Sequence, residues 1–154
     1  MKATTRLFGE IDINEEKIIT LERGMIGFPD LQRFALIFDE EKGLDATSIM
    51  WLQSMDDAAV AFPVMHPNQI KQDYNPTVND EMLSPLGRLN EDNTYVLVTL
   101  TAKPKKEDTT VNLKAPIVIN TETRKGCQII VEDDLPVKFR ICDALKEKKE
   151  KAGE

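Results

Sequence analysis

Histidine and cysteine, the residues most used in catalytic and metal sites, are scarce in this chain of 154 residues. The one histidine, His66, precedes Pro67, and the two cysteines, Cys127 and Cys142, do not form a CxxC pair. A GxSxG motif and a glycine-rich phosphate loop are missing too, so a catalytic triad lacks its base and its context. We therefore predict no catalytic residue, no cofactor-binding residue and no metal ligand. His66 is interpreted as a surface turn residue, and the cysteines as reduced structural thiols.

Positive charge is also in short supply. Twenty Lys and Arg residues stand against 27 Asp and Glu residues, which gives a formal net charge of -7 and a pI near 4.9. A surface of this sign does not attract phosphates, so no direct binding to nucleic acid is expected. No stretch approaches the roughly eighteen apolar residues of a membrane span, and the first ten residues lack the apolar core of a signal peptide. We expect no membrane contact and a cytoplasmic location.

Hydrophobic residues make up 41% of the chain, which is enough for one domain that folds alone. We place this domain at residues 1–142. Residues 143–154 contain acids and lysines around a single leucine and have little to bury. They are predicted to form a flexible, charged C-terminal tail.

The clearest pattern lies at residues 109–120. Apolar residues recur there at every second position, which is the period of a strand with one face in a core. They are Val111, Leu113, Ala115, Ile117 and Ile119. Pro116 cannot donate to a ladder, which predicts a bend or bulge near Ala115. Asn112 and Asn120 fall between the apolar positions, where they could be solvated or could bind the backbone of a neighbouring turn.

Other short apolar stretches bounded by turn residues predict further strands, at residues 6–13, 17–21, 34–38, 49–53, 58–65, 94–101 and 124–131. Only residues 79–83 have a helical pattern, with Asn79 or Asp80 as the cap. About eight short strands and one short helix predict an all-β fold. We expect a small antiparallel β-barrel-like domain, with a sandwich as the alternative.

Four longer stretches carry a resemblance to a known family. They are GMIGFPDLQRFAL from Gly24, WLQSMDDAAVAFPVMHP from Trp51, TVNLKAPIVIN from Thr110 and RKGCQII from Arg124. Together they resemble the flagellar assembly factor FliW family, and with their spacing they span nearly the whole chain. The sequence departs from the usual family pattern at Ile26, where members mostly have proline, and at His66, where they mostly have aspartate.

The resemblance implies a small β-barrel-like fold and two partners. One is flagellin, bound in the cytoplasm, and the other is the translational repressor CsrA, which otherwise blocks flagellin messenger RNA. Binding to CsrA would relieve that repression through partner switching. When free of both partners, the protein is expected to be a monomer.

Candidate contact residues follow from the chemistry of each partner. A filament subunit prone to aggregation would be held by large apolar side chains. We expect them in the loop that contains Gly24 and Gly27 and in the irregular segment at residues 66–89. These candidates, each of which could instead belong to the core, are Met25, Ile26, Phe28, Ile70, Tyr74, Met82 and Leu83. A repressor that binds RNA has a basic surface, which acidic groups would attract. The acidic candidates, each of which could instead be an ordinary solvated turn residue, are Asp80, Glu81, Glu132, Asp133 and Asp134.

Two classes of function remain open at this point. The first is a partner-switching protein without catalytic activity. The second is a small β-barrel enzyme or ligand carrier of unknown substrate. A concave apolar pocket with convergent polar groups of shifted pKa would favour the second class.

Overall fold

The structure is a computed structural model in which most of the chain is described. Of residues 2–4, 80 and 82 only the backbone is described. The described residues are 2–5, 9–13, 15, 18–37, 49–67, 74, 76–77, 80–101, 104–105 and 108–140. The predicted tail, Cys142 and Ile70 therefore lie outside the described part of the chain.

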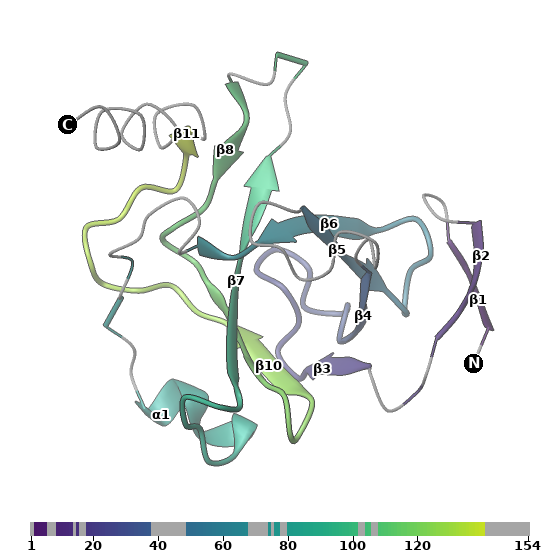
Figure 1. Cartoon of the computed structure of the whole chain (residues 1–154), viewed down its shortest axis with the longest axis horizontal. Coiled ribbons are helices and arrows are strands. Elements are labelled where there is room, and N and C mark those ends of the chain that lie inside the picture. Colours follow the sequence, from purple (N-terminus) through teal and green to yellow (C-terminus); the bar gives the residue numbers. More distant parts are fainter. Residues whose placement is uncertain are drawn as a thin grey trace.

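A closed barrel of seven strands forms the centre of the molecule (Figure 1). Neighbouring strands around the barrel are β7, β6, β5, β4, β3, β10 and β9, and β9 pairs again with β7. Their bounds are β3 Ile19–Leu21, β4 Arg33–Ile37, β5 Met50–Ser54, β6 Ala61–Met65, β7 Thr94–Thr101, β9 Ile117–Asn120 and β10 Lys125–Gln128. The predicted all-β, barrel-like fold is confirmed.

One strand pair departs from the predicted antiparallel arrangement. β10 runs parallel to β3, with Lys125 opposite Thr20 and Gly126 opposite Leu21, while the other barrel pairs are antiparallel. The reason is the odd number of strands, because directions cannot alternate all the way around a ring of seven. One parallel pair is the smallest departure that still closes the barrel and removes its open edges.

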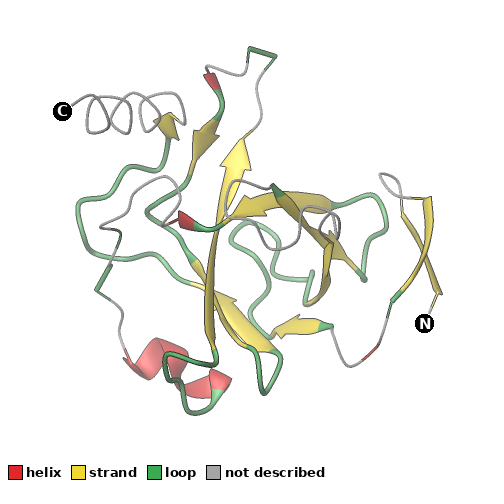
Figure 2. Cartoon of the chain, in the orientation of Figure 1, coloured by secondary structure: helices red, strands yellow, loops and turns green. Residues whose placement is uncertain are grey.

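The remaining elements lie outside the barrel (Figures 1 and 2). β1, Lys2–Thr5, and β2, Gly9–Asp12, form a separate two-stranded hairpin, of which the sequence predicted only the second strand. β8, Thr110–Val111, and β11, Phe139–Arg140, extend the sheet from the end of β7. The predicted helix is found as α1, Asp80–Leu83, and the 3-10 turn η3, Ser84–Leu86, follows it.

The stretch 109–120 is bent rather than continuous. It forms β8 and β9, and residues 112–116 between them belong to neither strand, so the predicted bend near Ala115 is confirmed. The prediction of one buried face is wrong for β9, because all four of its residues are buried. Val118 packs on the outer side of the barrel against Leu86, Ile129 and Val131.

The barrel interior is filled by apolar side chains from nearly every strand. The buried members of this core are Ile19, Leu21, Met25, Phe34, Met50, Leu52, Val64, Leu97, Ile117 and Ile119. Phe34 and Leu97 are completely buried. Because burial of apolar area is the dominant favourable term in folding, this cluster fixes the barrel on which the surface loops are mounted.

Candidate partner-binding site

A tight turn at residues 24–28 covers one part of the barrel. Met25 and Phe28 exchange backbone hydrogen bonds, with N–O distances of 3.2 and 2.7 Å. Gly27 has φ +87°, and Gly24 has φ +70° with the position of a Cβ only 2.5 Å from the Phe28 carbonyl oxygen, so both positions require glycine. The turn buries Met25 in the barrel core and leaves Ile26 50% exposed.

Gln128, the last residue of β10, fastens this turn to the barrel. Its Oε1 accepts a hydrogen bond of 2.8 Å from the Ile26 N–H, and its Nε2 donates one of 3.2 Å to the Ala115 carbonyl oxygen. Phe28 packs on the other side of the turn, edge to face against Phe62 of β6 at 5.3 Å between ring centroids. The turn is therefore held from both sides, and the direction of the Ile26 side chain is fixed by the backbone.

A groove of about 400 Å³ lies beside the turn. Its walls come from the 24–28 turn, β6, the end of β7, the bend at 112–115 and the segment after β10. Ile26, Ile130 and Val137 line it, with 50, 59 and 55% of their surfaces exposed. Large apolar side chains gathered at a concave surface are typical of a site that binds another molecule.

Three of the polar side chains that line the groove, those of Gln128, Asn112 and Lys114, have partners within the chain. Both functional groups of the Gln128 amide are hydrogen-bonded, as described above. Asn112 Oδ1 accepts hydrogen bonds from the N–H groups of Lys114 and Ala115, at 3.0 and 3.1 Å. Lys114 Nζ donates to the Asp133 carbonyl oxygen at 2.5 Å. The groove therefore offers apolar contacts next to the polar side chains of Thr99 and Thr101.

The acidic segment 132–134 follows directly after the groove residue Ile130 and the buried Val131. Glu132 and Asp134 are exposed, and Asp133 is half-buried. The Asp133 carboxylate accepts hydrogen bonds from the Thr77 N–H at 2.9 Å and from the Thr77 hydroxyl at 3.4 Å. Asp133 thus has a structural role, whereas the other two carboxylates face solvent.

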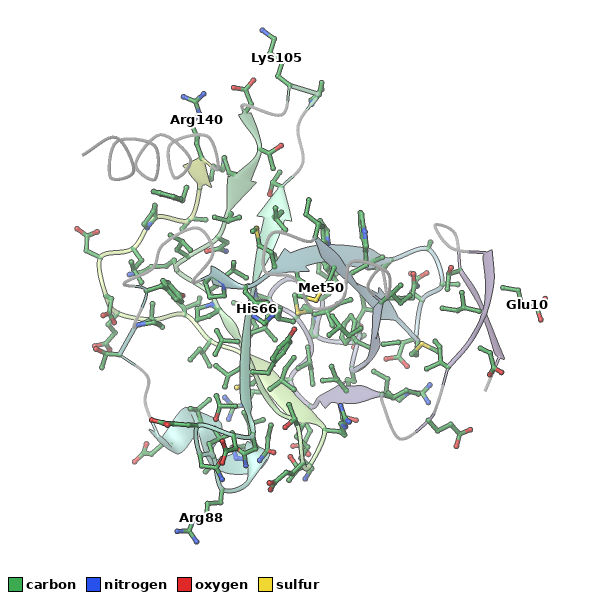
Figure 3. The ribbon with its side chains drawn as sticks, viewed as in Figure 1. Glu10, Met50, His66, Arg88, Lys105 and Arg140 are labelled. Carbon is green, nitrogen blue, oxygen red and sulfur yellow. The ribbon has the colours of Figure 1, made fainter. Side chains whose placement is uncertain are left out.

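His66 is more buried than the sequence interpretation held, and it is not a plain surface turn residue. Its Nε2 lies 2.8 Å from the Tyr95 hydroxyl oxygen, and the rings meet edge to face at 4.6 Å between centroids. The Tyr95 hydroxyl also lies 3.6 Å from Met50 Sδ, and Figure 3 shows His66 and Met50 close together in the middle of the molecule. Burial lowers the pKa of His66, and a hydrogen bond to the Val96 backbone opposes this only in part.

Other shifted pKa values also have structural causes. Burial raises the pKa of Tyr95 and of the Cys127 thiol, the latter against an opposing effect of the Arg23 charge. Partial burial would raise the pKa of Asp56, but hydrogen bonds from the Arg33 and Gln32 N–H groups and the Arg33 guanidinium together hold it below the usual 3.8. His66, Tyr95, Cys127 and Asp56 do not line the groove.

Comparison with known proteins decides the family. The sequence profile of the FliW protein family matches residues 2–141. This chain belongs to the FliW family. The flagellar assembly factor FliW of Lachnoclostridium phytofermentans is 39% identical over 152 residues, which cover 98% of this chain and 97% of that protein. The flagellar assembly factor FliW of Lachnospira eligens is 42% identical over 148 residues, covering 95% of this chain and 97% of that protein.

The fold agrees with a solved FliW structure. A crystal structure of the flagellar assembly factor FliW superposes with a TM-score of 0.82 at 32% sequence identity, covering 92% of this chain and 96% of that chain. The FliW family is named for an assembly factor and not for an enzymatic activity. Membership of the family supports a role in flagellar assembly.

The structure separates the apolar candidates into groups. Met25 and Tyr74 are 3% and 6% exposed, so for these two the core alternative is confirmed. The Tyr74 hydroxyl donates to the Leu113 carbonyl oxygen at 2.7 Å, and burial, with a smaller effect of Asp133, raises the pKa of Tyr74 to about 12. Leu83 is half-buried against the cluster around Leu86.

Ile26 and Phe28 are the apolar candidates that reach solvent, and their role in binding stays a prediction. Ile70 and the side chain of Met82 lie outside the described part of the chain. Among the acidic candidates, Glu81 is exposed on α1, and the side chain of Asp80 also lies outside the described part. Among the described residues, those of α1 do not line the groove, whereas Glu132 and Asp134 follow the groove residue Ile130 in sequence.

The sequence reasoning missed Ile130, Val137 and Phe62 as groove residues. For Ile130 a signal was present, because Cys127, Ile129 and Val131 set the inward phase of that stretch and Ile130 falls in the outward phase. Because its neighbours already supply the buried face, an isoleucine at an outward position indicates an exposed apolar side chain.

Two further observations concern only the described residues. Within them, no three His, Cys, Asp or Glu side chains lie close enough together to hold a metal ion. In the same part of the chain, no helix has the length and apolar character needed to cross a bilayer.

Proposed function

We propose that this protein is a flagellar assembly regulator that binds flagellin in the cytoplasm and also binds the translational repressor CsrA, thereby relieving repression of flagellin messenger RNA. The observation that carries the proposal is the groove with its exposed rim of Ile26, Ile130 and Val137 in a chain of the FliW family. Its relatives are named flagellar assembly factors, which supports a role in flagellar assembly.

The flagellin contact is expected to be mainly apolar. Binding energy in protein interfaces is concentrated in a few large side chains that become desolvated, and the exposed rim of the groove supplies three of them. A protein that keeps such side chains in water gains no stability from them. Covering an aggregation-prone subunit surface is a function that accounts for their exposure.

The repressor contact is expected to be mainly electrostatic. The net charge of -7 gives the molecule a field that attracts a basic partner, and Glu132 and Asp134 place two exposed carboxylates on one short segment. Complementary charge of this kind raises the rate of association more than it raises affinity. Neutralising Glu132 and Asp134 together should therefore slow CsrA association and leave flagellin affinity nearly unchanged.

The enzyme or ligand-carrier alternative receives less support from the groove. A catalytic pocket gathers polar groups with shifted pKa values, and the groups with shifted values described above lie elsewhere. The side chains of Gln128, Asn112 and Lys114, which line the groove, are hydrogen-bonded to the protein itself.

Titrations of the purified protein with monomeric flagellin and with CsrA, each at low and at high salt, test the proposal. Exposed charges are screened over about 8 to 10 Å at physiological ionic strength, so the CsrA contact should weaken with salt much more than the flagellin contact. Prior addition of one partner should lower the affinity for the other, and by linkage the effect must be reciprocal. Absence of binding to both partners would refute the proposed function.

A further inference from the structure

The groove has a charge pattern of its own that is unlike the rest of the molecule. The chain carries 27 acidic residues, yet among the described residues no acid lines the groove, and Lys114 is the one charged residue of that part of the chain that does. The described lining thus combines apolar and neutral polar side chains with a single cation in an acidic protein.

In the described part of the chain, the ammonium group of Lys114 has a hydrogen-bond acceptor but no carboxylate as an ion-pair partner. Its Nζ donates to the Asp133 carbonyl oxygen, which is a neutral acceptor. The carboxylate of the same residue points to Thr77 instead. This hydrogen bond uses one of the three N–H donors of the ammonium group and does not compensate its charge.

We infer that the groove receives an apolar segment of a partner protein that carries a carboxylate, with its apolar side chains against Ile26, Ile130 and Val137 and the carboxylate at Lys114. The inference rests on the proposed function, because the partner we assign to it is the flagellin subunit. Charge complementarity distinguishes this occupant from others. A basic repressor would meet a like charge at Lys114, and a second copy of this chain would bring its own net charge of -7.

The apolar part of the inference is tested with Ile130→Ser in the full chain, measured by titration with monomeric flagellin. Ile130 is 59% exposed, so the substitution leaves the fold intact, which a thermal melt checks. Loss of a central apolar anchor should weaken flagellin binding by about tenfold or more. Ile49→Ser is the matched control, because Ile49 is 50% exposed and does not line the groove. It should bind like the parent protein.

The charged part is tested with Lys114→Gln, which removes the charge and keeps a donor for the Asp133 carbonyl oxygen. The variant should bind flagellin more weakly at low salt and should lose the difference from the parent at high salt. Arg88→Gln is the control, because Arg88 is exposed and lies at the end of the molecule beside α1 (Figure 3). A neutral effect of Lys114→Gln at both salt concentrations would overturn the assignment of a carboxylate.

Each remaining outcome points to a different conclusion. If the parent protein binds flagellin and Ile130→Ser binds equally well, the groove assignment is wrong while the proposed function stands. If the parent protein does not bind flagellin, both fail. If Ile130→Ser instead abolishes CsrA binding, or abolishes self-association seen by sedimentation velocity, the groove belongs to the repressor or to a second copy, and our assignment is overturned.

Discussion

The β9–β10 hairpin is covered at one end and open at the other. At the turn end, η3 and the residues after it lie over the hairpin, and Leu86 is 2% exposed. At the other end, beyond Gln128, Ile130 remains 59% exposed at the groove. Leu86 is therefore buried at one end, whereas Ile130 is exposed at the other end, where we propose that it contacts a partner.

The covered end shows how a polar side chain can also be buried. Asn120 is 1% exposed, and its Nδ2 donates to the carbonyl oxygens of Leu86 and Arg88 at 2.8 and 3.4 Å. Its Oδ1 accepts hydrogen bonds from the N–H groups of Glu122 and Thr123. Because every polar atom of the side chain has a partner, burial carries little penalty, and the amide ties the covering segment to the hairpin.

The largest effect should separate the two ends directly. Leu86→Ala removes a buried side chain and leaves a cavity, so it should lower the free energy of unfolding by about 3 kcal/mol. Ile130→Ala, at the open end, should change it by less than about 0.5 kcal/mol, because its side chain is mostly in water already. Urea unfolding of both variants measures the difference. Equal losses would mean that the open end stabilises the fold as much as the covered end does.

Asparagine substitutions should repeat the contrast with a smaller effect. Asn120→Ala would remove the four hydrogen bonds that this buried amide makes to the covering segment and to the hairpin turn, and we expect a loss of about 2 kcal/mol. Asn112→Ala, at the groove, removes two hydrogen bonds of a half-buried side chain, so a loss of about 1 kcal/mol is expected. Chemical denaturation compares the two. A smaller loss for Asn120→Ala than for Asn112→Ala would contradict our description of the covered end.

Within the open end, the two glycines of the 24–28 turn should differ. Both have positive φ, but a Cβ at Gly24 would lie 2.5 Å from the Phe28 carbonyl oxygen, whereas a Cβ at Gly27 meets no atom within 4 Å. Gly27→Ala should cost about 1 kcal/mol for the left-handed backbone, and Gly24→Ala should cost more and also displace the turn. Thermal melts and flagellin titrations of the two variants test this, since only Gly24→Ala should impair both.

The smallest expected effect is a loss of folding stability at acidic pH. Burial lowers the pKa of His66, so the unfolded chain binds a proton more readily than the folded one. This contribution to stability is fully present above the unfolded pKa, about 6.5, and is lost as the pH falls below it. Asp56, with its pKa held below 3.8, stays charged throughout this window. Unfolding from about pH 7.5 to about pH 5.5 should show a decline that is smaller in His66→Gln. If stability declines as much in His66→Gln as in the parent protein, other titratable groups cause the decline.

Much of the barrel could be predicted from the sequence because its determinants are local. The period-two pattern, the proline at 116 and the turn residues indicated the strands, the bend and the hairpins. The parallel β3–β10 pair could not be predicted, since it follows from the number of strands that close the ring. Burial of Asn120 could not be predicted either, because the segment that covers it comes from more than 30 residues away. Of the residues that line the groove, Met25 and Ile26 were among the apolar candidates, while Ile130 was assigned to no surface.

Hydrogen–deuterium exchange of the protein with and without excess monomeric flagellin tests the central claim most directly, because it reports on both ends of the hairpin in one experiment. We predict added protection at residues 24–28 and 127–131, next to the groove, and no change at residues 84–93, which cover the other end. Protection confined to residues 84–93, with the groove segments unchanged, would contradict the claim that the open end binds flagellin.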